Sequence, residues 1–82
     1  MRTAILPAWL PLWSDSGELV GENHVQALCG RYDDGWRLRE LTVFTQLGQA
    51  VAIMDRWEAV AGFGLAEIER LEHKARVRSD VG

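Results

Sequence analysis

Apolar residues in the second half of the chain recur every three or four positions, the spacing of one face of an α-helix. The first series is Leu47, Ala50, Val51, Met54, Trp57 and Ala61, and the second is Leu65, Ile68, Leu71 and Ala75. The pattern predicts two amphipathic helices, over 46–61 and 65–78, with a frayed tail over 79–82. We expect Thr45 to be the N-cap of the first helix and Gly62 its stop, with a hinge at Gly62-Phe63-Gly64.

The first half, 1–44, has the shorter period of β-strands. Val25, Ala27 and Cys29 alternate with other residues, which places them on one face of a strand. Asp33-Asp34-Gly35 between two β-prone runs predicts a hairpin turn. In the strand that follows, the alternation slips by one position, and a bulge near Glu40 would restore it.

Two prolines shape the first strand. Pro7 and Pro11 each lack an amide donor, so we expect this segment at a sheet edge or in an extended connection. The apolar residues beside them, above all Trp9 and Trp13, allow two interpretations. They could fold over the end of the core, or they could form an exposed aromatic patch that docks a partner.

The predicted fold class is α+β: a small antiparallel sheet of three to four strands with two C-terminal helices packed on one face. Short helices are marginal alone in water, so both must lie on an apolar surface. The 82 residues predict one domain, 1–82, with a small core. A homodimer that covers leftover apolar surface is therefore possible.

Composition narrows the function classes. The net charge of −3 disfavours a duplex-DNA binder, which needs a basic stripe, so we expect no direct nucleic-acid binding. The single cysteine, Cys29, excludes an intramolecular disulfide framework and suits the reducing cytoplasm. No apolar run approaches membrane-spanning length, and 1–13 lacks the cleavage site of a signal peptide. We expect a cytoplasmic protein that does not enter the membrane.

No constellation of residues points to catalysis. Glu69 and His73 stand four apart on one helix face, which is half of a metal site, and a surface ion pair explains them as well. Cys29 and His24 lie too far apart along a strand to form a nucleophile and its base, so Cys29 is expected in the core. We expect a protein that is not an enzyme and that holds no metal or cofactor.

One stretch has a family likeness. Gly62-Phe63-Gly64-Leu65 followed by Ile68-Glu69, after a helix that carries Trp57, resembles small phage anti-CRISPR proteins of the type I-F inhibitor group. The resemblance covers the C-terminal half. It implies a non-catalytic inhibitor that binds a type I CRISPR surveillance complex and blocks its access to target DNA.

Exposed charged and aromatic residues on the predicted hairpin and last helix are the candidates for partner binding. They are Tyr32, Asp33, Asp34, Arg37, Arg39, Glu69, Arg70 and His73. The leading hypothesis is a protein-binding inhibitor, because rigid surfaces with a few aromatic and charged anchors suffice for recognition. The alternative is a small RNA- or single-strand-binding module that uses the same hairpin face, or else a dimeric adaptor.

Overall fold

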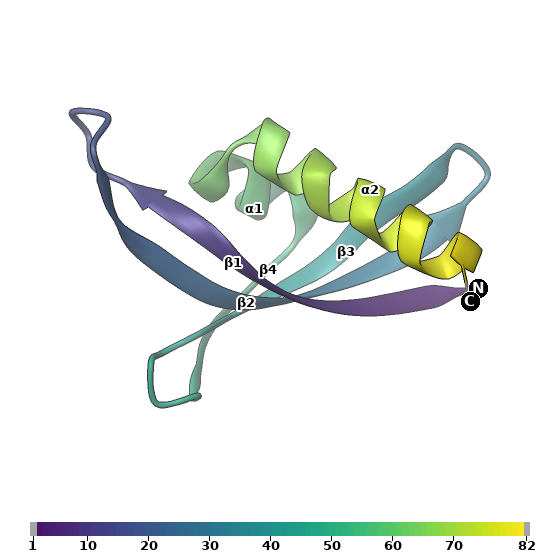
Figure 1. The fold of residues 1–82 in the computed structure, drawn as a ribbon, viewed down its shortest axis with the longest axis horizontal. Coiled ribbons are helices and arrows are strands. Elements are labelled where there is room, and N and C mark those ends of the chain that lie inside the picture. Colours follow the sequence, from purple (N-terminus) through teal and green to yellow (C-terminus); the bar gives the residue numbers. More distant parts are fainter. Residues whose placement is uncertain (1, 82) are drawn as a thin grey trace.

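A computed structural model describes residues 2–81, which form four strands and then two helices (Figure 1). The elements are β1 (Thr3–Trp13), β2 (Leu19–Tyr32), β3 (Gly35–Phe44), β4 (Ala50–Met54), α1 (Arg56–Phe63) and α2 (Leu65–Val81). The strands form one antiparallel sheet in the order β1-β2-β3-β4, and the helices cover one of its faces. The predicted α+β class is confirmed.

The core lies between the sheet and α2, where alternate strand residues meet one stripe of the helix. The buried apolar residues are Leu6, Ala8, Leu10, Val25, Ala27, Cys29, Trp36, Leu38, Leu41, Val43, Ala59, Ile68, Leu71 and Ala75. The last three are the predicted stripe of the second helix, whereas Leu65 is half exposed. Burial of this stripe is what stabilises α2, since a lone helix of this length is marginal in water.

The predicted bulge is present in β3. Cys29 pairs with Leu38 and Leu28 with Glu40, so Arg39 is the extra residue. Because of this insertion, Leu38 and Leu41 both face the core although three positions separate them.

β1 is an edge strand, which is one of the two placements that Pro7 and Pro11 predict. The structure also decides between the two interpretations of the apolar residues in this region. Leu10 is fully buried in the core, but Trp9 and Trp13 are more than half exposed. The tryptophans therefore do not close the core, and their rings remain available on the surface.

The helix predicted over 46–61 is wrong in its first half. Residues 45–49 form a turn and Ala50–Met54 pair with β3 as β4. The Thr45 hydroxyl accepts a hydrogen bond from the amide of Gln49 within this turn, so Thr45 is not a helix N-cap. The apolar residues of the Ala-Val-Ala-Ile-Met segment fit both the helical and the strand period. The segment forms a strand because it pairs with β3.

α1 begins one residue after Asp55, which is the true N-cap. Its carboxylate accepts from the amide of Glu58, whose own carboxylate accepts from the amide of Asp55, a complete capping box. The helix ends at Phe63, and Gly64, with φ +98°, makes the reversal that was expected of Gly62. α2 continues to Val81, so 79–81 are not frayed, and Gly82 lies outside the described residues. Neither helix is long and apolar enough to cross a membrane.

Candidate functional site

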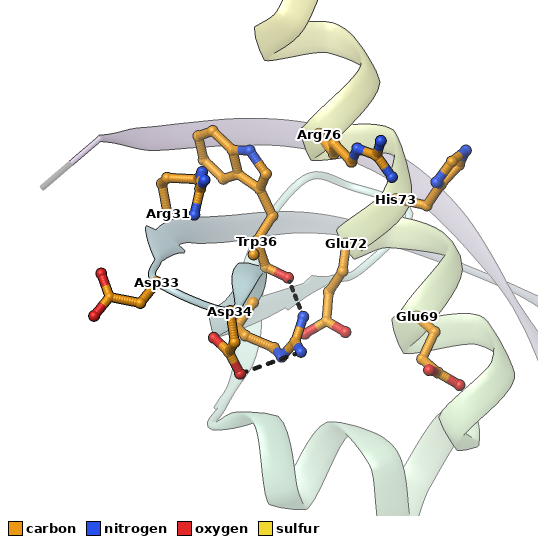
Figure 2. A pocket seen from close by; sticks show the side chains of 10 residues that line it. Arg31, Asp33, Asp34, Trp36, Glu69, Glu72, His73 and Arg76 are labelled. Atoms are coloured by element: carbon orange, nitrogen blue, oxygen red, sulfur yellow. Dashed lines mark hydrogen bonds and ion pairs between the residues drawn. The ribbon is translucent and has the colours of Figure 1, made fainter.

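The β2–β3 hairpin and α2 enclose an open cleft of about 450 Å³ (Figure 2). Its lining consists of Arg31, Asp33, Asp34, Gly35, Trp36, Arg37, Glu69, Glu72, His73 and Arg76. Three arginines and four carboxylates line it, so the cleft presents both signs of charge. Such a surface favours a ligand with charged groups of both signs over a uniformly charged one.

The hairpin wall is held by its turn and by one arginine. Asp33 and Asp34 have negative φ and Gly35 has φ +122°, so the glycine supplies the unusual backbone conformation of the turn. Arg37 donates to the carbonyl of Trp36 at 2.9 Å and to the carboxylate of Asp34 at 3.3 Å. These two bonds hold the guanidinium of Arg37, a residue of the cleft lining, against the turn.

The floor of the cleft is a buried carboxylate. Glu72 of α2 is 6% exposed and accepts from the backbone amide of Leu38 at 2.7 Å. The same carboxylate binds Arg56 through two hydrogen bonds of 2.8 and 3.1 Å. The hydrogen bond to Glu72 raises the pKa of Arg56 above its ordinary value, although partial burial acts in the opposite direction. A buried charge that is satisfied in this way fixes the position of α2 against β3.

Glu72 lies beside the first half of β3, which β4 does not reach. β4 pairs with β3 only over Leu41–Phe44, so the first half of β3 has no strand on that side. The carboxylate oxygen takes the amide of Leu38 in place of a strand carbonyl. The side chain therefore has a structural role beneath the cleft.

Five of the eight predicted binding residues line the cleft: Asp33, Asp34, Arg37, Glu69 and His73. The other three lie outside its lining. Tyr32 is 37% exposed and belongs to the hairpin, Arg39 is the exposed bulge residue, and Arg70 is bound to Glu67 at 2.6 Å on α2. The structure thus joins the two predicted groups of residues into one surface.

Sequence reasoning missed the buried Glu72 of the cleft and its partner Arg56, which lies outside the cleft lining. Glu72 reaches Leu38 across 34 positions, and Arg56 reaches Glu72 across 16. Nothing in the local pattern predicts such pairs, because they depend on how α2 crosses the sheet. One indirect signal existed, since Glu72 directly follows Leu71, a residue of the predicted buried stripe of this helix.

Among the described residues, the lining of the cleft contains no serine, threonine, cysteine or lysine. Burial, and secondarily the negative charge of Glu72, raises the pKa of the Cys29 thiol from 9.0 to about 11. A reactive cysteine needs the opposite shift, and Cys29 is fully buried in the core. Among the side chains that the structure describes, those of residues 2–79, no three His, Cys, Asp or Glu are placed to share a metal ion.

The sheet face opposite the helices carries a row of rings. Trp9 and His24 stack with centroids 4.8 Å apart, and His24 lies 5.6 Å from Phe44. These residues belong to β1, β2 and β3, so the row crosses the sheet, and Trp9 is 59% exposed.

Comparison of the chain with protein-family models, curated proteins and solved structures finds no match. Function must therefore be argued from the chain's own surfaces.

Proposed function

We propose that this protein is a non-catalytic, cytoplasmic protein-binding inhibitor that docks its partner in the cleft between the β2–β3 hairpin and α2. One observation carries the proposal. Exposed charges of both signs from two separate elements line one open cleft, above the buried Glu72 that fixes those elements. Fixed charges of this kind give specificity and fast association in protein complexes.

The expected partner is a protein surface with both acidic and basic groups. Arg37 and Arg76 would meet carboxylates of the partner, and Asp33, Asp34 and Glu69 would meet its basic side chains. The raised pKa of Cys29 supports a role without covalent chemistry.

In its most specific form, the proposal is that this is a phage anti-CRISPR protein that binds a type I CRISPR surveillance complex and prevents DNA binding. Its support is the resemblance at Gly62-Phe63-Gly64-Leu65 and Ile68-Glu69. In the structure, these residues form the α1–α2 junction and the start of α2, next to the helical wall of the cleft.

The test is binding of the tagged chain to a purified type I surveillance complex, with two charge reversals compared. Arg37→Glu changes the cleft, and Arg39→Glu makes the same change two residues along the same strand, outside the cleft. We expect Arg37→Glu to weaken binding at least ~10-fold and Arg39→Glu to change it less than ~3-fold. Equal losses from both variants would show that the cleft is not the interface.

A parallel pull-down from host lysate, with and without nuclease, tests the class of partner. A captured protein supports the proposal if nuclease leaves it bound and Arg37→Glu releases it. Capture that nuclease abolishes would contradict the proposal.

The ring row favours a second candidate, a single-strand-binding module. Bases can stack on exposed aromatic side chains of a sheet, and the row of Trp9, His24 and Phe44 is a platform of this kind. Under this candidate, a fluorescent single-stranded oligonucleotide binds with strong salt dependence, and Trp9→Ala weakens it by about 1–3 kcal/mol. No binding at 50 mM salt would eliminate it.

A further inference from the structure

The exposed edges of this sheet are not protected in the same way. On β1, Pro7 and Pro11 remove amide donors, and Arg78 donates to the carbonyl of Ile5 at 3.2 Å. On the first half of β3, Glu72 occupies the amide of Leu38. Prolines, charges and covering groups are the means by which proteins prevent an edge from pairing with another chain.

β4 has neither proline nor charge. It is the other edge strand, and its sequence is Ala-Val-Ala-Ile-Met. Its one irregularity is a bulge at Val51, between the pairs of Ala50 with Phe44 and Ala52 with Val43. A short apolar edge of this kind is a template for an added strand.

The surroundings of β4 are also apolar and neutral. No charged residue occurs between Glu40 and Asp55, although 26% of the chain is charged. The large apolar residues along β4 and next to it are the most exposed in the described chain: Leu47 90%, Trp57 85%, Ile53 64% and Val51 60%. Leu47 lies in the turn before β4 and Trp57 in the first turn of α1 after it.

We propose that β4 pairs antiparallel with β4 of a second copy of this chain, which joins two sheets into one of eight strands. A two-fold axis makes any such edge complementary to itself. Each copy carries a net charge of −3, so a dimer is favoured where neither copy presents charge, and the segment 41–54 meets that condition.

The area also favours a second copy. A standard interface buries roughly 800 Å² on each partner, about one seventh of the 5635 Å² that this chain exposes. Five strand residues cannot supply that area, but Leu47 and Trp57 flank the strand and can add to it. This surface is separate from the charged cleft, so dimerisation and partner binding can succeed or fail independently.

The experiment is sedimentation velocity on the full chain from about 1 to 200 µM, with Ile53→Lys and Ile5→Lys compared. Both isoleucines are more than half exposed on edge strands, and only Ile53 lies on the unprotected one. We expect a wild-type dimer, which Ile53→Lys weakens at least ~100-fold because it places two like charges in an apolar contact. We expect Ile5→Lys to leave the dimer intact.

Hydrogen exchange identifies the pairing itself. Amides within Ala50–Met54 should exchange more slowly as the concentration of the wild-type chain rises, while those of β1 should not change. Circular dichroism of Ile53→Lys checks its fold, and Val51→Lys serves as a second variant. A wild-type monomer at 200 µM, equal losses from Ile53→Lys and Ile5→Lys, or unchanged β4 exchange would each overturn the proposal.

Discussion

β3 takes part in two hairpins, which differ in their charge and in whether α2 forms a cleft with them. The β2–β3 hairpin has two carboxylates at its turn, and it forms a cleft with α2 (Figure 2). The β3–β4 hairpin, Leu41–Met54, has no charge at all, and its turn exposes Leu47 almost completely. The first suits recognition by complementary charges, and the second suits pairing between backbones.

The boundary between these two regions is the point where β4 ends. Before Leu41, β3 has no strand partner on that side, and Glu72 binds the amide of Leu38 instead. The buried carboxylate is tolerated because Arg56 and that amide satisfy it. The Glu72 side chain thus takes the place of a strand partner for the amide of Leu38 and supports the cleft.

The largest expected effect comes from removing this carboxylate. Glu72→Ala leaves the amide of Leu38 without a partner and Arg56 without its counter-charge. We expect the free energy of unfolding to fall by about 3 kcal/mol, as measured by urea denaturation. Glu72→Gln keeps an oxygen acceptor for the amide but loses the ion pair and one hydrogen bond from Arg56, so it should cost less than Glu72→Ala.

The control for this comparison is Glu67→Ala, since Glu67 forms an ion pair with Arg70 on the more exposed side of the same helix. That change should cost less than about 1 kcal/mol. If Glu72→Ala costs no more than Glu67→Ala, Glu72 does not hold β3 and α2 together.

The second effect is a loss of stability at alkaline pH that comes from Cys29. Its pKa is about 11 in the folded protein against an ordinary 9.0, so between these values the unfolded chain loses the thiol proton and the folded chain keeps it. This thiol's contribution to stability is complete below pH 9 and is lost as pH rises through 11. The loss amounts to about 2–3 kcal/mol.

Urea denaturation from pH 8 to 11 on the wild type and on Cys29→Ala measures this contribution, because other groups titrate equally in both. The difference between the two proteins should shrink by the stated amount as pH rises. Glu72→Gln should reduce the shrinkage, since the charge of Glu72 is the smaller cause of the raised pKa. A constant difference would contradict a raised thiol pKa.

The parts of the fold that local rules govern were predictable. Pro7 and Pro11 predicted a sheet edge or an extended connection for the first segment, and the edge is what forms. Asp33-Asp34-Gly35 predicted a hairpin turn, and the slip in alternation predicted a bulge near Glu40. The apolar stripe of Ile68, Leu71 and Ala75 predicted α2. Each of these signals acts within a few residues, so no knowledge of the tertiary fold was needed.

The error at β4 came from a segment whose apolar residues fit both periods. Two local signals pointed the other way. Asp55 and Glu58 have the spacing of a capping box, which places the helix start after Met54. Thr45-Gln46-Leu47-Gly48 repeats the pattern of Ser14-Asp15-Ser16-Gly17. In both turns the glycine has φ +85°, and the hydroxyl of the first residue accepts from the amide of the residue after the glycine.

The candidate site was predictable only in its exposed members. Charges on a hairpin tip and on the outer face of a helix are visible in the sequence, but their meeting in one cleft depends on the path of α2. Glu72 and Arg56 were missed because their partners are distant in sequence. Long-range pairs of this kind follow from the fold, so a single sequence does not reveal them.

The smallest expected effect compares the two hairpin turns through their glycines. Gly35 has φ +122°, far from the left-handed region that other residues reach, whereas Gly48 has φ +85°, close to it. A Cβ at Gly48 meets nothing within 4 Å, and one at Gly35 meets only the end of the Arg37 side chain at 3.5 Å. The cost of a substitution at either site therefore comes from the backbone. We expect Gly35→Ala to lower the free energy of unfolding by about 2 kcal/mol and Gly48→Ala by about 1 kcal/mol.

Gly48→Asn separates backbone strain from other causes, because asparagine adopts left-handed conformations more readily than alanine. It should recover part of the loss at the β3–β4 turn, whereas Gly35→Asn should recover little at φ +122°. Urea denaturation of the four variants gives the ranking. Equal costs at both glycines would mean that the two turns tolerate side chains alike, and that the hairpins differ in charge and cover but not in backbone strain.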